Sequence, residues 1–388
     1  MGNIGSIGTK CVGCRSCEQS CPKGCIEMRP DGEGFLYPVV DQSRCVDCGK
    51  CLRACPAADP QRHRAEGPLA VWAWRTRDPE DLLRSASGGA ADSAAKTILD
   101  RGGRVYGAAY DRDLTVCHVE ITDQAQRARL RSSKYVQSDP KNTYALARSA
   151  LDRGQPVLFT GTPCQIEGLY AFLGGDRPDL YTLDLVCHGV PSPALFRSYL
   201  RLQEHRLGGP VRSYDFRSKE KRGWGTQYRV ETPGRVKTGA LALDPYGKHF
   251  MDGDCYRECC YGCPYANTRR PGDLTVGDFW GIAGSHPDFD SEKGVSSVFV
   301  NTEKGARLLE DMAPLGETCP ATLAEGLAKQ RNLVRPTPRP AARDGFYENM
   351  DRPEYWQTHG VGLQPKERLK ALLPPGLLRA LKRRLGRK

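Results

Sequence analysis

The chain has 388 residues, of which 39% are hydrophobic, and it carries a formal net charge of +11. This length predicts two or three domains and is enough to bury a core. No stretch approaches the roughly 18 apolar residues of a membrane-spanning helix, and the N-terminus lacks the apolar segment of a signal peptide. We therefore expect a cytoplasmic protein. Its 17 cysteines then indicate metal or redox chemistry, because cytosolic thiols are kept reduced.

The positive charge is concentrated near the C-terminus. Residues 366–388 hold nine Lys or Arg and one Glu, so this segment supplies +8 of the +11. The rest of the chain is close to neutral, and we expect no nucleic-acid partner. Leucines at near-helical spacing within the basic tail indicate either peripheral contact with an anionic membrane surface or a solvated terminus.

Two cysteine motifs of identical spacing lie in the first sixty residues. The segments "CVGCRSCEQSCP" and "CVDCGKCLRACP" both have the pattern C-x2-C-x2-C-x3-C-P. In two-cluster ferredoxins the fourth cysteine of each run binds the other cluster, whereas zinc is held by two separated pairs. The spacing therefore predicts two [4Fe–4S] clusters, one bound by Cys11, Cys14, Cys17 and Cys55, the other by Cys45, Cys48, Cys51 and Cys21.

The motifs divide the chain into segments. A ferredoxin alone would end after the second motif, but more than three hundred residues follow, so the clusters are expected to serve a larger body. A polar stretch with Pro and Gly indicates a linker. We expect a ferredoxin-like domain over 1–58, a linker over 59–68, a body in two parts over 69–160 and 161–320, and a C-terminal extension over 321–388.

After the linker, short apolar runs alternate with helical patterns, which predicts an α/β (α+β) body with a mixed sheet. No G-x-G-x-x-G motif follows a strand, so a Rossmann dinucleotide site is not predicted. The expected strands cover 69–74, 104–109, 116–121, 156–160, 180–186, 273–279 and 297–301. The expected helices cover 89–101, 140–153, 164–173 and 193–206.

Two polar loops in the body have the composition of a phosphate-binding or flavin-binding site. In "RSASGGAADSAAKTIL", Ser87, Gly88 and Gly89 precede an alanine-rich helix. Glycines admit a ligand close to the backbone, and a helix N-terminus attracts anions. In "RSSKYVQSD", a lysine lies between serines and a tyrosine. The alternatives are an ordinary serine cap of the helix and an ordinary surface loop.

Cysteines of the body indicate a further metal site. Cys164 follows a strand at the start of a helix, where its pKa is expected to be lowered, and Cys187 ends another strand. Cys260 and Cys263 have the two-residue spacing of a metal-binding pair. The spacing leaves three alternatives open: a third [4Fe–4S] cluster, a zinc ion, or structural thiols, with Cys164 also suited to act as a nucleophile. The spare cysteines would be Cys255 and Cys259.

The motifs "SASGG", "SSKYVQS", "FTGTPCQIEGL", "DLVCHGVPSP" and "CYGCPYANTRRPGDLTVGDFWG" follow the dicluster segment in that order. Together they resemble the coenzyme F420 hydrogenase/dehydrogenase beta-subunit family, over roughly residues 8 to 310. The resemblance implies an iron–sulfur flavoprotein with FAD in the body. It implies that a flavin-proximal cluster is bound by Cys164, Cys187, Cys260 and Cys263. The FAD site that it implies comprises Ser87, Gly88, Gly89, Ser133, Lys134 and Tyr135.

Three polar residues are expected to face the substrate. The resemblance places Asp278 near the substrate or the flavin edge, with a buried turn as the alternative. His188 is expected either to donate a proton near the flavin or to hold the cluster loop, and Lys134 completes this catalytic set. We expect an FAD-dependent oxidoreductase that passes electrons between ferredoxin-type clusters, FAD and a small molecule such as F420. The alternative is a non-catalytic subunit that delivers electrons to a partner enzyme. In both cases a ferredoxin or a partner enzyme is the expected redox partner.

Overall fold

The computed structural model describes residues 2–60, 62–63, 65–352, 354–360 and 373. The basic tail, for which the sequence indicated either membrane contact or a solvated terminus, therefore lies outside the described residues, apart from position 373. In the described ranges, no helix combines the length and the apolar character that crossing a bilayer requires.

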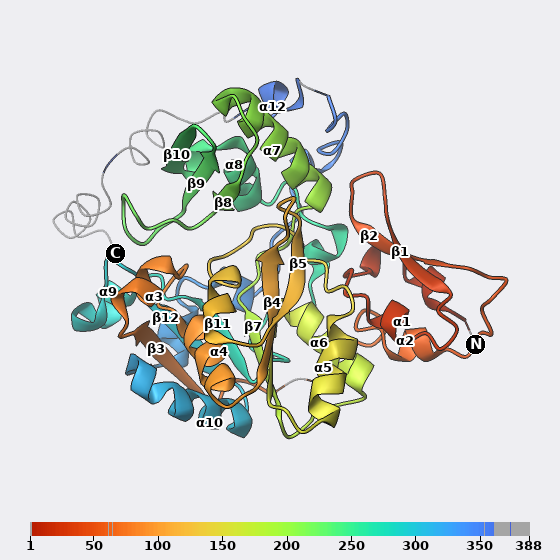
Figure 1. Ribbon diagram of the computed structural model, residues 1–388, viewed down its shortest axis with the longest axis horizontal. Helices are drawn as coiled ribbons and strands as arrows, with labels where there is room; N and C mark the ends of the chain where they lie inside the picture. Colours follow the sequence, from red (N-terminus) through yellow and green to blue (C-terminus); the bar gives the residue numbers. More distant parts are fainter. Residues whose placement is uncertain (1, 61, 64, 353, 361–372, 374–388) are drawn as a thin grey trace.

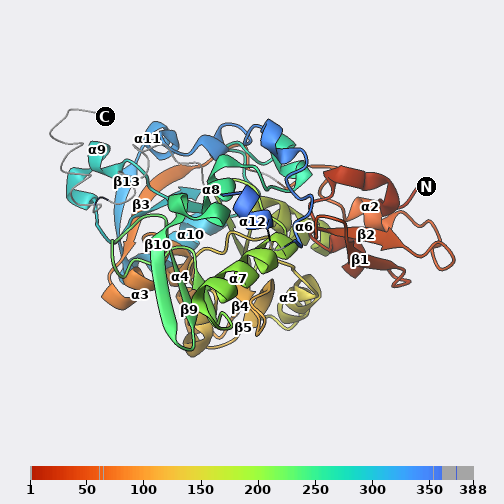
Figure 2. The ribbon, with the colours of Figure 1, turned by 90° about the horizontal axis from the view of Figure 1, so that it is seen from above.

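Residues 2–58 form a small unit at one end of the molecule, beside α5 and α6 of the body (Figure 1; Figure 2). Strands β1 (Ile26–Pro30) and β2 (Leu36–Val40) pair in antiparallel orientation. The core of the unit combines buried cysteines with a few aliphatic side chains, as expected for a domain too small to bury a large apolar core. Its short helices are η1 (Ile4–Lys10), α1 (Ser16–Gln19) and α2 (Lys50–Arg53).

An eight-stranded mixed sheet forms the centre of the body, in the order β13-β3-β12-β11-β7-β6-β4-β5. Strands β11, β7, β6 and β4 are mutually parallel, and the outer strands run antiparallel to their neighbours. This confirms the predicted mixed α/β body behind a small ferredoxin-like domain. The strands are β3 (Ala70–Thr76), β4 (Arg104–Tyr110), β5 (Val116–Ile121), β6 (Val157–Gly161), β7 (Leu180–Leu185), β11 (Leu274–Asp278), β12 (Ser296–Val300) and β13 (Gly316–Ala321).

Helices cover both faces of this sheet. On one face, α4 (Ala90–Asp100) and α10 (Glu303–Met312) pack their apolar sides against the central strands. On the other face, α5 (Thr143–Asp152) and α6 (Pro163–Leu173) pack against β4, β6 and β7. Because both faces are covered, the inner strands are largely buried, and all five residues of β12 are buried although two of them are serines.

A second, three-stranded sheet lies beside the main one, at the top of Figure 1. It packs with α7 (Pro193–Leu207), α8 (Pro245–Asp252) and α12 (Tyr355–Thr358) around an aromatic core. This sheet was not predicted from the sequence. Its strands are β8 (Ser213–Asp215), β9 (Gln227–Thr232) and β10 (Arg235–Ala240). The remaining α-helices of the described residues are α3 (Pro79–Arg84), α9 (Ile282–Ser285) and α11 (Leu323–Leu327), and several short 3-10 helices lie between the larger elements.

The strand directions bring the predicted motifs to one edge of the main sheet. Strand β3 is antiparallel to β12, which is antiparallel to β11, so β3 runs in the same direction as β11, β7 and β6. The carboxyl ends of these four strands therefore meet at one edge, which is where open α/β sheets bind ligands. Asp278 ends β11, and Cys164 and Cys187 closely follow β6 and β7.

Candidate functional site

A cavity of about 850 Å³ lies at this edge of the sheet, and the ferredoxin-like unit forms part of its wall. Its volume is near the upper end of the range for small-molecule and cofactor sites. The walls come from the loop before α4, the 130–138 loop, the ends of β6, β7 and β11, and the 258–266 segment. The predicted site residues that line it are Ser87, Gly89, Ser133, Lys134, Tyr135, Cys164, Cys187, His188, Cys260, Cys263 and Asp278.

The structure brings the predicted ferredoxin ligands together in two sets. Burial raises the pKa of Cys14, and the neighbouring thiols of Cys55, Cys17 and Cys11 raise it further. Burial also raises the pKa of Cys17, with Cys11 and Cys55 adding to the effect. The other four predicted ligands line one small cavity beside β1, together with Cys25; they are Cys21, Cys45, Cys48 and Cys51.

The four predicted thiols of the body also lie together. Burial raises the pKa of Cys164, and the thiols of Cys263 and Cys187 raise it further. This is opposite to the direction expected from its place at the start of α6, because desolvation outweighs the hydroxyl of Thr162, which lies 3.2 Å from the sulfur and lowers the pKa. Burial also raises the pKa of Cys263 to about 12, again with Cys187 as a neighbour.

Cys259 lies with this group, although the sequence indicated a spare cysteine. Its thiol helps to raise the pKa of Cys164, Cys187 and Cys263, and it lines the same cavity. The pKa of Cys259 is lowered, first by its contact with the Cys260 thiol. Five thiols therefore converge here. Cys255, the other spare cysteine, is fully buried in the aromatic core and does not line the cavity.

Lys134 is held in a half-buried turn of the 130–138 loop, where Ser132 adopts a left-handed conformation (φ 64°). Its Nζ donates to the carbonyl oxygens of Arg131 at 2.8 Å and Arg129 at 3.3 Å. Burial lowers the pKa of Lys134 to about 7, and the nearby Asp215 carboxylate only partly offsets this. A lysine that titrates near neutral pH inside a cavity is a candidate functional group.

Tyr135 follows Lys134 and faces the same cavity. Its ring stacks on Phe250, with ring centroids 4.3 Å apart and planes inclined by 16°. Its hydroxyl accepts a hydrogen bond from Arg217 Nη1 at 3.0 Å. The predicted "SSKY" motif is thus fixed at both ends, by backbone carbonyls around the lysine and by an aromatic stack under the tyrosine.

Asp278 is fully engaged by buried partners. Arg217 donates to both of its oxygens, at 2.7 and 2.9 Å, and the indole nitrogen of Trp224 donates to Oδ1 at 2.7 Å. The Trp224 ring in turn stacks on Trp280, with centroids 4.5 Å apart. A two-point Arg–carboxylate pair of this geometry is strongly directional, so Asp278 is placed to orient Arg217 and Trp224 at the cavity wall.

The glycines before α4 serve different purposes. Gly88 does not line the cavity, and a Cβ there would lie 2.1 Å from the carbonyl oxygen of Trp74 and 2.4 Å from the nitrogen of Ser296. Gly88 is therefore required for packing against β3 and β12. Gly89 does line the cavity and caps α4 in a left-handed conformation (φ 87°). The hydroxyl of Ser87 lies 2.6 Å from that of Ser296.

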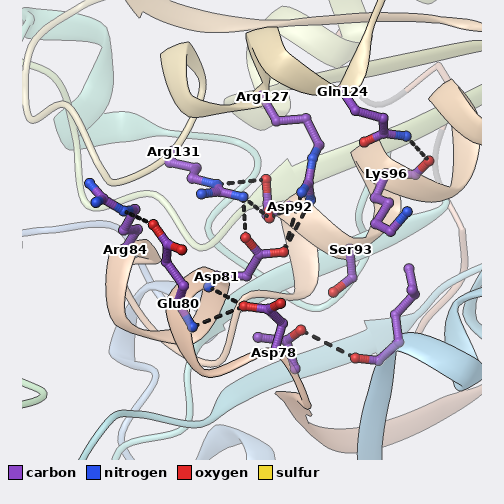
Figure 3. A network of polar contacts seen from close by, with 12 residues as sticks. Asp78, Glu80, Asp81, Arg84, Asp92, Ser93, Lys96, Gln124, Arg127 and Arg131 are labelled. Carbon is purple, nitrogen blue, oxygen red and sulfur yellow. Dashed lines mark hydrogen bonds and ion pairs between the residues drawn. The ribbon is translucent and has the colours of Figure 1, made fainter.

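A cluster of two arginines and two aspartates joins the 127–131 segment to α3 and α4 (Figure 3). Arg127 and Arg131 both pair with Asp92 on α4 and with Asp81 on α3. Arg131 and Asp92 also line the cavity. No sequence motif indicated this network, since its members come from three separate segments. It fixes the loop that carries Lys134 against the N-terminal turn of α4.

His188 also faces the cavity, beside the body thiols. Burial lowers its pKa, and its ring meets Phe250 edge-on at 6.5 Å between centroids. The backbone carbonyl of His188 accepts a hydrogen bond from the hydroxyl of Thr337 at 3.0 Å. The loop after Cys187 is thereby fixed through its backbone, which leaves the imidazole facing the cavity.

Two family models match the chain. The model for the C terminus of the coenzyme F420 hydrogenase/dehydrogenase beta subunit matches residues 154–320, and the 4Fe-4S dicluster domain matches residues 10–58. The fold and the thiol sets are those of an iron–sulfur protein that transfers electrons in redox reactions. Residues 154–320 therefore match the C-terminal domain of the coenzyme F420 hydrogenase/dehydrogenase beta-subunit family, behind a 4Fe-4S dicluster domain.

Comparison with solved structures gives a match to a chain from the F420-reducing [NiFe] hydrogenase complex of Methanosarcina barkeri, at 21% identity and a TM-score of 0.49. The match covers 82% of this chain and 98% of that one. No curated protein matches the chain.

The residues present fit the groups that the family implies. All 17 cysteines are free thiols, and thiolates are the ligands of iron–sulfur clusters. No three His, Cys, Asp or Glu side chains in the described ranges converge on the position of one metal ion. For a flavin nucleotide, the cavity offers its volume, the glycine-capped start of α4 and aromatic side chains.

Proposed function

We propose that the protein is a cytoplasmic FAD-dependent iron–sulfur oxidoreductase that acts on a small organic substrate, with F420 as one candidate. The observation that carries this proposal is the shared cavity. It is lined both by five thiols and by Gly89, Lys134 and Tyr135. When bound, [4Fe–4S] clusters move single electrons and FAD exchanges electrons in pairs, which supplies the redox chemistry.

The packing of α6 gives a short path between the ferredoxin-like unit and the cavity. Cys164 and Gly168 lie one turn apart on the same face of this helix. A Cβ at Gly168 would lie 3.0 Å from Cys14 Sγ, so the helix approaches the ferredoxin-like unit closely at this point. Tyr144 lies near both thiols, since Cys14 and Cys164 both help to raise its pKa and its hydroxyl lies beside Gly168. The helix therefore holds a predicted ligand of one cluster next to a predicted ligand of another.

Roles for the cavity residues follow from their placement. We infer that Gly89 and the start of α4 receive a phosphate of the cofactor, because the exposed backbone N–H groups of a helix start favour anions. Lys134 holds or releases a proton at Nζ beside the substrate, which a pKa of about 7 permits at neutral pH. Tyr135 and Trp280 supply aromatic walls, and Asp278 orients the Arg217 guanidinium.

Cofactor analysis of anaerobically purified protein tests this function. We expect about twelve iron atoms per chain, at four per cluster, and one non-covalent FAD. Cys164→Ser is expected to reduce the iron content by about four atoms. Cys255→Ser provides the matched control, since its thiol lies in the aromatic core and its loss should leave iron unchanged. Full iron without flavin would refute the flavoenzyme proposal, and about eight iron atoms in the unmodified protein would refute the third cluster.

A further inference from the structure

Arg257 lies at the junction between the ferredoxin-like unit and the body. Its side chain is fully buried. Its backbone is anchored in the body, where its N–H donates to the carbonyl of Val190 and its own carbonyl accepts from the nitrogen of Cys260, both at 2.9 Å. The side chain extends from this anchor to the ferredoxin-like unit.

The guanidinium contacts both parts of the molecule. Its Nε donates to the carbonyl of Cys11 at 2.6 Å, and its Nη2 donates to the carbonyl of Leu36 at 2.9 Å. From the body, Gln137 Oε1 accepts from Nη1 at 3.2 Å. The guanidinium also lies over the ring of Tyr37, 4.0 Å from its centroid. Its donors are thus directed at the backbone of a predicted cluster ligand.

The loop that carries Cys11 is fitted to this arrangement. Gly13 has a left-handed conformation (φ 69°), and a Cβ there would lie 2.8 Å from Gln137 Nε2 and 3.3 Å from Arg257 Nη1. Gln137 Nε2 in turn donates to the carbonyl of Val12 at 2.9 Å. The 11–14 loop therefore closes directly onto the two side chains, with no room for a larger residue between them.

The charge of Arg257 has no carboxylate partner among the described residues. The acidic groups that act most strongly on it are the thiols of Cys11 and Cys259, followed by Tyr37 and Cys260. A buried cation without a counter-charge is unfavourable, so this one is matched to anionic thiolates. Three other buried arginines are each paired with a carboxylate: Arg217 with Asp278, Arg270 with Asp184 and Arg343 with Glu33.

We propose that Arg257 is a positioning residue whose buried positive charge stabilises the reduced state of the cluster bound through Cys11. The proposal rests on the proposed function, because it requires the clusters. Net charge and hydrogen bonding around a cluster set its reduction potential. A fixed cation in a low-dielectric interior favours the state with one more negative charge. The step concerned is the uptake of one electron from a reduced one-electron donor, with no bond broken and no proton moved.

Redox titration of the holoprotein followed by electron paramagnetic resonance tests this proposal. We expect Arg257→Gln to shift the midpoint potential of the Cys11-bound cluster to a more negative value, with its signal identified by the change that Cys14→Ser causes. Arg257→Lys keeps the charge and is expected to keep the potential close to that of the unmodified protein. The cluster bound through Cys45, Cys48 and Cys51, whose thiols Arg257 does not contact, is expected to be unchanged.

A double variant distinguishes the effect of the Arg257 charge from the effect of the contact between the ferredoxin-like unit and the body. Arg343 also joins the body to the ferredoxin-like unit, through its ion pair with Glu33. The double variant Glu33→Gln/Arg343→Gln removes this contact without changing the net charge. It is expected to leave all midpoint potentials unchanged. An equal negative shift in this variant would show that loosened docking, and not the charge of Arg257, sets the potential, and would overturn the proposal.

A second substitution keeps the test decisive if Arg257→Gln loses iron. Gln137→Glu places a carboxylate next to Nη1 and neutralises the guanidinium without removing it, so it is expected to lower the same midpoint potential. An unchanged potential in Gln137→Glu with full iron overturns the proposal. Unmodified protein without any [4Fe–4S] signal would instead refute the proposed function.

Discussion

At the scale of single residues, His118 is buried in a neutral form. Its Nδ1 lies 2.8 Å from the hydroxyl of Ser138, and its Nε2 lies 3.0 Å from the carbonyl of Thr160, where it must donate. The ring also stacks on Phe159. Burial lowers the pKa of His118 to about 4. Protonation would remove the acceptor that Ser138 uses and place a charge beside the cavity.

This shift predicts acid lability. Above pH 6.5 the histidine is neutral in both states, so its contribution to stability is constant. As the pH falls from 6.5 to 4, the unfolded chain binds a proton that the folded chain does not, and the free energy of unfolding decreases by about 3 kcal/mol in total. We expect thermal unfolding curves of His118→Gln to depend less on pH over this window than those of the unmodified protein. The exposed His205 is the control, and His205→Gln should leave the dependence unchanged; an equally steep dependence in His118→Gln would contradict this account.

A substitution at Asp278 can distinguish a structural role of this residue from a catalytic one. Asp278→Asn removes the charge that compensates the buried Arg217, so we expect a loss of about 3 to 5 kcal/mol in unfolding free energy. Differential scanning calorimetry measures this loss. The double variant Asp278→Asn/Arg217→Gln should recover part of it, because no unpaired charge remains. Unchanged stability with slower turnover would instead support the direct catalytic role that the sequence indicated.

At the scale of elements, α6 couples the ferredoxin-like unit to the body. Gly168 on this helix faces Cys14 Sγ and the Tyr144 hydroxyl, both about 3 Å from where a Cβ would lie. Gly168→Ala should therefore displace the ferredoxin-like unit and cost about 1 to 3 kcal/mol. We also expect slower electron transfer between the unit and the body, measured by rapid mixing with reduced ferredoxin. Gly284→Ala is the matched control, because its Cβ meets nothing within 4 Å, and it should be neutral or slightly stabilising.

The same scale shows which elements a sequence can predict. All seven expected strands are present. The clearest signals are short apolar runs such as "PVLFT", which becomes the central strand β6. The edge strand β13 has the sequence "GETCPA", and β10 has "RVKTGA". These strands are polar or half exposed and contain Gly or Pro, so their pairing depends on the neighbouring strand and leaves no local pattern.

The candidate site likewise contains residues that the sequence can predict and residues that it cannot. Cysteine spacing is a local property, and both ferredoxin sets and the Cys260–Cys263 pair were predicted from it. Cys164 and Cys187 were indicated by their places after strands, and the family resemblance joined the four into one predicted set. The partners of Asp278 were not predictable, since Arg217 and Trp224 are more than fifty residues away in sequence. Cys259 was predicted to be spare because adjacent cysteines do not reveal which thiol faces a cavity. Gly88 was expected to admit a ligand. Position 88 instead requires glycine because a side chain there would clash with β12, which lies more than two hundred residues later in the sequence.

At the scale of the whole molecule, the thiols form a continuous series. One set lies at the outer end of the ferredoxin-like unit, where Val46 is 58% exposed between Cys45 and Cys48. The second lies against α6, and the third lines the cavity. An electron carrier needs only the two sets of thiols in the ferredoxin-like unit. The cavity beyond the third set is the feature that a pure carrier does not require.

The last prediction therefore separates an enzyme from a carrier. Hydride transfer needs near contact between the reacting atoms, so an enzyme must bind its substrate in this cavity. We expect the flavin of the isolated protein to react directly with a two-electron partner, in a screen of F420, nicotinamides and other small acceptors. Lys134→Gln should slow this reaction roughly tenfold or more, while iron content and electron exchange with ferredoxin stay unchanged. Lys237→Gln is the control, because that lysine lies over Tyr228 on the second sheet, away from the cavity. A flavin that responds to ferredoxin alone, across the whole screen, would identify the protein as an electron-transfer subunit for a partner enzyme.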